Sequence, residues 1–347
     1  MAHGFGSGLS FFYRNVDYLL DSGSVGRVIL VDWLGMGGSA RPPCWESPVR
    51  SVFSNRARGR GRRRRRRRPG PISFCDSEFS PSSAIDFFLD PFDDMLRDEG
   101  LFDVGSEPLW LVGHSLGGYL VGRYAMRIHD DRVGRSSSSP NVTKIVMASP
   151  VGFRPLPPPP RERISSMSTS PTALRLVDAL WSANLTPQAI VRVMGPTRGK
   201  YAVRRALGGR IPHLDGPELD LLAEYLYHVT VAPPSGEYAM NSLMEPGSSE
   251  EDGSVGVYAL EPLGDGAMAG AISRSRERSP SLSTLESIKV LFGDGDWMAF
   301  HEPEARREMG RIRTECGVRS AVHIVPRAGH HLYLDNPESF GRHIVED

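Results

Sequence analysis

The apolar positions of this chain fall into short runs separated by longer stretches of mixed polarity. Five of the runs are rich in aliphatic and β-branched side chains, which is the pattern of strands buried in a parallel sheet. Such strands, alternating with helical segments, predict an α/β fold with a mostly parallel sheet flanked by helices. The predicted strands are Arg27–Asp32, Leu109–Val112, Lys144–Ala148, Ile288–Phe292 and Ala321–Val325.

Between these runs, several segments carry apolar residues at helical spacing. Ser82 or Ser83 is expected to cap the second of the predicted helices, and Pro91 predicts a kink or break inside it. The predicted helical ranges are 9–20, 83–97, 119–127, 171–185, 187–194, 217–229 and 302–313, with a closing helix around Phe340.

The composition changes twice along the chain and predicts a sheet domain interrupted by an insertion. Residues 1–152 form the first part of the predicted core and residues 286–347 the second, with a helical lid over 153–285 between them. The Gly/Ser/Glu-rich segment 247–284 predicts a partly disordered insertion within the lid. A chain of 347 residues is long enough for one large α/β domain with such a subdomain.

A basic block interrupts the first part of the core at about residues 44–82. It contains the unbroken arginine run Arg62–Arg68. Like charges at this density repel one another, which predicts a disordered segment. Contact with anionic lipid or nucleic acid, or nuclear targeting, is the alternative. We favour a solvated surface insertion because no aromatic residues alternate with the arginines.

Charge and cysteine content exclude several classes of protein. The formal net charge is +0, so no overall field points to nucleic acid or an anionic membrane. The cysteines Cys44, Cys75 and Cys316 match neither a disulfide framework nor zinc-ligand spacing, which favours a reducing compartment. The sequence contains no stretch of about 18 apolar residues, so it predicts no transmembrane helix. The first residues lack the basic start and apolar centre of a signal peptide.

The stretch Gly113–Gly118 carries the candidate chemistry. It has the form Gly-x-Ser-x-Gly, with an apolar run before it and a predicted helix after it. This is the nucleophile-elbow pattern, in which the serine sits on a strained turn at the start of a helix. We therefore predict that Ser115 is a nucleophile and that the backbone N–H of Leu116 stabilises an oxyanion.

The remaining catalytic candidates follow the last two predicted strands. Asp296 is preferred to Asp294 as the acid because it lies three residues past Gly293, the usual offset in this arrangement. His330 is preferred to His331 as the base because it directly follows a glycine. The order Ser, Asp, His along the chain is that of the α/β-hydrolase triad. His114 is expected to pack or hydrogen-bond locally, and no metal or organic cofactor is expected.

The first residues, His3–Gly6, resemble the His-Gly loop that supplies a second oxyanion donor, here the N–H of Phe5. In this fold the loop should follow a buried strand. We therefore expect the first three strands to be missing from the chain, which is the main departure from the pattern.

Together, six segments resemble a family of lipid-acting α/β-hydrolases. That family includes cardiolipin-specific deacylases, lysophospholipases acting on N-acylphosphatidylethanolamines, and a lipase co-activator of lipid droplets. Gly293–Met298 and Gly329–Pro337 are the more specific segments. The six are His3–Gly6, Asp32–Pro42, Gly113–Tyr119, Gly236–Asn241, Gly293–Met298 and Gly329–Pro337.

The resemblance implies a serine hydrolase that cleaves a fatty-acyl ester of a phospholipid, of cardiolipin or lysophospholipid type, at a membrane surface. The resemblance also implies that the protein is located at a mitochondrial or other intracellular membrane. Two alternatives remain open. The family's His-x4-Asp motif, here His330 to Asp335, has been linked to acyl transfer onto lysophosphatidic acid. The co-activator member is not an enzyme and carries asparagine where this chain keeps Ser115.

Overall fold

The computed structural model describes residues 1–42, 80–103, 105–129, 140–156, 186–248, 255–278 and 284–346. Most of the arginine-rich block and the helix predicted over 171–185 lie outside the described residues. No described helix is both long and apolar enough to cross a bilayer.

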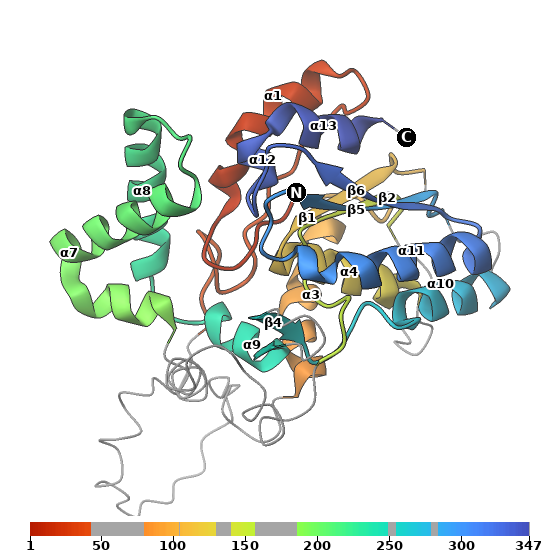
Figure 1. Ribbon diagram of the computed structural model, residues 1–347. Helices are drawn as coiled ribbons and strands as arrows, with labels where there is room; N and C mark the ends of the chain where they lie inside the picture. Colours follow the sequence, from red (N-terminus) through yellow and green to blue (C-terminus); the bar gives the residue numbers. More distant parts are fainter. Residues whose placement is uncertain are drawn as a thin grey trace, which may run out of the picture.

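A parallel four-stranded sheet forms the centre of the fold, in the order β1-β2-β5-β6 (Figure 1). Every residue of β2 and β5 is buried, because helices cover both faces of the sheet. The sheet confirms four of the predicted strands. Their observed bounds are β1 Leu109–His114, β2 Val142–Ala148, β5 Ser287–Gly293 and β6 Arg319–Val325.

The first residues extend the sheet beyond β1. Ala2 bridges in parallel to Gly113 on one side and to Val31 on the other. The N–H of Ala2 donates to the carbonyl of Val112 at 2.8 Å, and Val31 donates to Met1 at 2.9 Å. The N-terminus therefore lies at the sheet, in a strand position beside β1 (Figure 1).

The strand predicted over Arg27–Asp32 is wrong for most of its length, because among these residues only Val31 forms a β-bridge. A parallel strand needs a hydrogen-bonded neighbour along its whole length. Residues 24–29 instead line a cavity of about 790 Å³, which also borders β1. The apolar composition predicted a whole strand. In the described part of the chain, however, only the end of this segment has a neighbouring strand position to pair with.

Alternate residues of the central strands face two separate hydrophobic clusters. Ile145 and Met147 of β2 point into one cluster, and Val146 and Ala148 point into the other. This is the two-residue period of a strand buried on both faces. The first cluster is covered by α3 Pro81–Asp98, α4 Leu116–His129, α10 Ala267–Arg278 and α11 Glu302–Cys316. The second is covered by η1 Leu9–Phe12, α1 Tyr13–Asp21, α12 Leu332–Asp335 and α13 Pro337–Val345.

Helix α3 differs from its prediction at its start and at its proline. Ser80, rather than Ser82 or Ser83, caps it by accepting a hydrogen bond from the N–H of Ser83 at 3.2 Å. The helix then continues through Pro91. Buried apolar residues on both sides of the proline, including Phe88 and Phe92, anchor the helix to the core and outweigh the lost backbone hydrogen bond.

Two helices stand out to one side of the sheet domain (Figure 1). They are α7, Pro187–Arg210, and α8, Gly216–Val231, and they confirm the helices predicted in this region. Helix α7 is broken at Gly195, whose φ of 74° is outside the helical range. The connection back to the sheet runs through α9 Gly236–Leu243 and the hairpin of β3 Met244–Ser248 with β4 Val255–Ala259.

The disorder predicted for 247–284 is wrong for its described part, which contains β4 and α10. Met268 and Ile272 of α10 are buried in the first cluster, and the Cys316 thiol of α11 donates to the Ala269 carbonyl. A few well-spaced apolar residues hold α10 in spite of the polar composition around it. Helix α10 therefore packs with the sheet domain, although it falls within the range 153–285 predicted as a lid.

Candidate active site

Ser115 occupies a sharp turn between β1 and α4, with a φ of 54°. The turn is possible because its neighbours lack side chains. A Cβ on Gly113 would lie 2.2 Å from the carbonyl oxygen of Gly117, and one on Gly117 would lie 2.5 Å from the carbonyl oxygens of Ala2 and His3. The strained serine and the crowded glycines are the geometry of a nucleophile elbow.

The carboxylate of Asp296 and the imidazole of His330 meet at the carboxyl edge of the sheet. His330 Nδ1 lies 3.0 Å from Asp296 Oδ1, which also accepts the N–H of Met298 at 2.9 Å. Burial raises the pKa of Asp296, but hydrogen bonding and charge attraction from His330 outweigh burial, so the pKa lies below its usual value. The acid is therefore ionised and fixed against the predicted base.

The structure separates the roles of the two aspartates in the loop after β5. Asp294 accepts the N–H groups of Arg327 at 2.8 Å and Ala328 at 2.9 Å, and these hydrogen bonds lower its pKa. It thereby ties the loop after β5 to the loop that carries His330. Asp294 therefore joins two loops, and Asp296 is the aspartate of the two that contacts His330.

Sequence reasoning missed Ser149, which directly follows β2. Its hydroxyl donates to Asp296 Oδ2 at 2.5 Å. The residue is fully buried and has a φ of 48°, a strained conformation for a residue with a side chain. Its position just past the carboxyl end of a strand was the available signal, since the site lies along that edge.

Two neighbouring histidines, the buried His114 and the half-buried His331, are neutral. His114 donates from Nε2 to the carbonyl of His330 at 2.8 Å. Burial, with the nearby His330 and His331, lowers its pKa well below the usual value. His331 contacts the hydroxyl of Tyr333 through Nδ1 at 3.0 Å, and burial lowers its pKa to about 3. His114 thus packs as expected, and of the three imidazoles it is His330 that bonds a carboxylate.

The loop at His3–Gly6 lies against the elbow. A Cβ on Gly4 would lie 2.8 Å from Cβ of Ser115. The carbonyl of Gly4 accepts His3 Nδ1 at 2.7 Å and the Ser7 hydroxyl at 2.9 Å. In a trans peptide the following N–H points opposite to the carbonyl, so these bonds set the direction of the Phe5 N–H. Leu116, the other predicted donor, is the first residue of α4.

Asp32 supports this loop from behind and was not predicted as a site residue. Its Oδ1 lies 3.1 Å from His3 Nε2 and accepts the N–H of Leu9 at 2.7 Å, while Oδ2 accepts the N–H of Gly38 at 2.8 Å. Burial raises the pKa of Asp32, but hydrogen bonds from His3 and Gly38 outweigh burial and lower it. The signal was an aspartate just past an apolar run, at the same edge as the other candidates.

The two members of the His-x4-Asp motif have different hydrogen-bond partners in the structure. Asp335 accepts the N–H of Gly329 at 2.8 Å, and its other oxygen lies 3.5 Å from His213 Nδ1. Asp335 does not cap α13, since Asn336 does so by accepting the N–H of Ser339 at 3.2 Å. Asp335 instead anchors the loop that presents His330.

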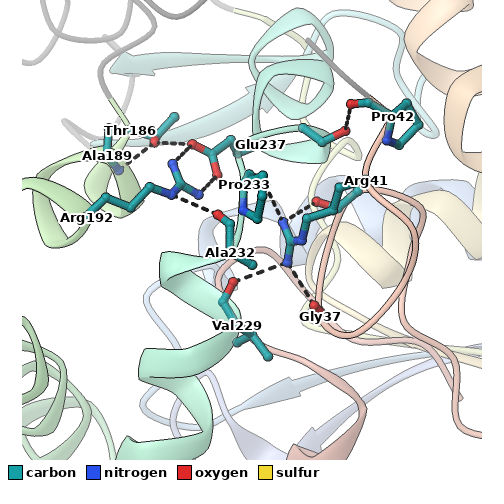
Figure 2. Close-up of polar contacts among 12 residues, drawn as sticks. Gly37, Arg41, Pro42, Thr186, Ala189, Arg192, Val229, Ala232, Pro233 and Glu237 are labelled. Atoms are coloured by element: carbon teal, nitrogen blue, oxygen red, sulfur yellow. Dashed lines mark hydrogen bonds and ion pairs between the residues drawn. The ribbon is translucent and has the colours of Figure 1, made fainter. Parts of the chain in front are cut away.

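Two arginines join the projecting helices to the sheet domain (Figure 2). Arg41 donates to the carbonyls of Gly37 at 2.8 Å and Val229 at 3.2 Å, which bridges the loop after Asp32 to α8. Arg192 of α7 forms a two-pronged ion pair with Glu237 of α9 at 2.7 and 2.6 Å. A cavity of about 30 Å³ lies beside this network and is bordered by Phe5, Arg41 and Glu237.

The described residues contain no group of three or more His, Cys, Asp or Glu side chains arranged to hold a metal ion. The site described above consists of a serine on an elbow and a histidine–aspartate pair at the carboxyl edge of a parallel sheet, with the loop His3–Gly6 against the elbow.

Comparison with known proteins agrees with this fold. A family model described as the alpha/beta hydrolase fold matches residues 1–337. The chain therefore belongs to the α/β-hydrolase fold family. A laboratory-evolved variant of potato epoxide hydrolase has the same fold, with a TM-score of 0.52 and 16% identity over 99% of this chain and 89% of that one.

Two relatives confirm the resemblance to lipid-acting members of the family. The chain is 27% identical over 351 residues to a rice protein named probable 1-acylglycerol-3-phosphate O-acyltransferase, covering 98% of this chain and 64% of that protein. It is 25% identical over 348 residues to the bovine (Lyso)-N-acylphosphatidylethanolamine lipase, covering 100% of this chain and 77% of that protein. The chain thus spans less than two thirds of the length of its rice relative.

Proposed function

We propose that this protein is a serine hydrolase that cleaves a fatty-acyl ester of a phospholipid. The observation that carries the proposal is the bond between His330 and Asp296 beside the strained elbow of Ser115. These groups follow three strands of one parallel sheet, which brings them to a single edge.

The reaction divides into two acyl transfers. His330 Nε2 takes the proton of the Ser115 hydroxyl as the oxygen attacks the ester carbonyl. The N–H groups of Phe5 and Leu116 stabilise the resulting oxyanion. Asp296 holds the imidazole orientation and stabilises its charged form. The tetrahedral intermediate collapses to an acyl-enzyme as the alcohol leaves with the proton from His330, and water then releases the fatty acid by the same steps.

A lipid substrate is supported by the names of the relatives and by the apolar surroundings of the base. Trp297 is 54% exposed, and its ring centroid lies 5.1 Å from that of His330. An exposed aromatic ring beside the base suits an acyl chain or a glycerol backbone. Within the lipid class, we propose the cardiolipin or lysophospholipid type.

Transfer of the acyl group to a lysophospholipid is the second candidate, favoured by the acyltransferase name of the rice relative. The same acyl-enzyme would serve, with the alcohol of lysophosphatidic acid replacing water. This route needs no bond between His330 and Asp335, in agreement with the contact of Asp335 to Gly329.

The proposal is tested with a fluorophosphonate probe, which reacts with activated serines. We expect label on Ser115, found by peptide mass spectrometry, and its loss in Ser115→Ala and His330→Ala. His228→Ala, which removes an exposed histidine of α8, serves as the matched control and should label normally. Labelling elsewhere, or none on a folded chain, would overturn the hydrolase proposal.

The substrate is then sought by fatty-acid release from cardiolipin, lysophospholipids and N-acylphosphatidylethanolamine. Adding lysophosphatidic acid tests the second candidate through formation of phosphatidic acid. A labelled protein that releases no acid from any of these lipids would overturn the phospholipid part of the proposal.

A further inference from the structure

The exposed side of α7 is more apolar than a solvated helix requires. Ile190, Val193 and Met194 lie on one face of its first half and are 52%, 84% and 38% exposed. Tyr201, in the second half, is 65% exposed. Single exposed apolar side chains are common, but a stripe at helical spacing indicates a surface that contacts something apolar.

Packing onto the part of the protein that the structure describes does not account for these residues, because α7 and α8 bury another face there. Val203 and Leu207 of α7 are buried, as are Leu222 and Tyr227 of α8. Leu207 and Leu222 belong to the second hydrophobic cluster of the sheet domain. The inner face therefore holds the helices in place, and the outer apolar residues contribute nothing to that packing.

The same helix is strongly basic. Its 24 residues include Arg192, Arg198, Lys200, Arg204, Arg205 and Arg210 and no acidic residue. Arg192 pairs with Glu237, and Lys200 and Arg204 pair with Glu224 and Asp220 of α8.

Arg198 and Arg205 are exposed and form no ion pair with the described residues. They lie three positions before and four after Tyr201, on the same side of the helix. Apolar side chains flanked by unneutralised arginines match the chemistry of a bilayer interface that carries anionic headgroups.

We propose that exposed residues of α7, on both sides of its break at Gly195, dock the protein on an anionic lipid bilayer. This docking surface consists of Ile190, Val193, Met194, Tyr201, Arg198 and Arg205. The inference rests on the proposed function, since it brings the site to a membrane-bound phospholipid. The apolar residues enter the boundary between headgroups and acyl chains, and the arginines contact lipid phosphates. The projection of α7 and α8 from the sheet domain leaves this surface accessible (Figure 1).

Vesicle co-sedimentation of the full chain tests the docking surface. Phosphatidylcholine vesicles are compared with vesicles that also contain phosphatidylserine. We expect the wild-type chain to prefer the anionic vesicles. Val193→Glu should weaken binding at least fivefold, because a charge replaces an apolar group at the interface. Ile324→Glu, an exposed apolar position on β6, is the matched control and should bind as wild type.

The electrostatic part is tested by Arg198→Glu/Arg205→Glu, which should abolish the preference for anionic vesicles, at about fivefold for each arginine lost. Arg307→Glu/Arg313→Glu on α11 makes the same change of charge elsewhere and should keep the preference. The proposal is overturned if the α7 variants bind like wild type, or if wild type fails to bind. Conversion of a dimer to a monomer by Val193→Glu in sedimentation velocity would also overturn it.

Hydrolysis of 4-nitrophenyl butyrate, a water-soluble ester, separates this inference from the proposed function. The α7 variants should retain it, because no residue of the docking surface belongs to the catalytic site. A chain that binds vesicles through α7 but hydrolyses no ester would retain the docking surface and refute the hydrolase. A chain that hydrolyses the soluble ester, but whose vesicle binding is unchanged by the α7 substitutions, would support the hydrolase and refute the docking surface.

Discussion

The hydroxyl of Ser149 donates a 2.5 Å hydrogen bond to Asp296, on the carboxylate oxygen opposite the one that faces His330. The acid is therefore held from two sides by residues that follow different strands. Ser149 adopts a φ of 48° to make this bond, so backbone strain is retained at the site. We interpret Ser149 as a positioning residue for the acid.

Removing the Ser149 hydroxyl should lower kcat for ester hydrolysis about tenfold, because a hydrogen bond to a charged group contributes about 1.5–3 kcal/mol. Ser149→Ala keeps a side chain at the strained φ, whereas Ser149→Gly relieves the strain. The free energy of unfolding of the glycine variant should therefore exceed that of the alanine variant by about 1 kcal/mol. Both variants should raise the pKa of Asp296, because the hydroxyl no longer stabilises the charged carboxylate. An unchanged kcat in both variants would show that the contact has no catalytic consequence.

Asp32→Asn should lower kcat by roughly 10–100-fold and leave KM nearly unchanged. The reason is that Asp32 holds His3, which in turn sets the direction of the Phe5 N–H, and an oxyanion donor acts mainly in the transition state. Steady-state kinetics measures the split. Asp220→Asn, an exposed position on α8, is the matched control. A rise in KM with kcat retained would instead assign Asp32 to substrate binding.

The ion pair of Arg192 with Glu237 should be more important for stability than exposed pairs on the same helices. The Glu237 side chain is 6% exposed and that of Arg192 17%. Glu237→Ala should lower the free energy of unfolding by about 3–5 kcal/mol, since it leaves a half-buried guanidinium without its carboxylate partner. Asp220→Ala, which breaks the exposed pair with Arg204, should cost less than about 1 kcal/mol. Urea denaturation measures both, and equal losses would contradict the prediction.

Acid should destabilise the protein through its buried histidines. His301 accepts the Arg154 N–H through Nδ1 at 3.0 Å, and its Nε2 contacts the Val257 carbonyl at 3.1 Å. Burial lowers its pKa to about 4. The unfolded chain binds the proton below its ordinary pKa of 6.5, whereas the folded chain does so only below about 4. Stability is therefore lost as the pH falls from 6.5 to 4.

For His301 alone this linkage amounts to about 2 kcal/mol at pH 5. Urea denaturation at pH 7 and pH 5 measures it. His301→Gln removes the titrating group and should make the loss of stability between these pH values smaller. A loss as large as that of wild type would show that His301 does not contribute to acid sensitivity.

Features determined by neighbours in the sequence could be predicted from the sequence. The parallel strands β1, β2, β5 and β6 followed from short apolar runs, since a strand covered on both faces needs apolar residues at successive positions. The elbow at Ser115 followed from its two glycines, because the turn leaves no room for side chains there. The positions of Asp296 and His330 followed from their offsets beyond strand ends, and the structure brings the two together.

Other features depended on residues distant in the sequence. Packing of Met268 and Ile272 makes α10 a helix of the core in a segment whose composition predicts disorder. The strand predicted over Arg27–Asp32 pairs only near its end, where Val31 forms a bridge with Ala2. Ser149 and Asp32 could be recognised as site residues only in the folded chain, where Ser149 contacts Asp296 and Asp32 contacts His3. Sequence alone thus determined the local elements and the order of the candidate catalytic groups. Their supporting contacts were decided by tertiary structure, because such a hydrogen bond joins side chains whose distance is set by packing rather than by spacing along the chain.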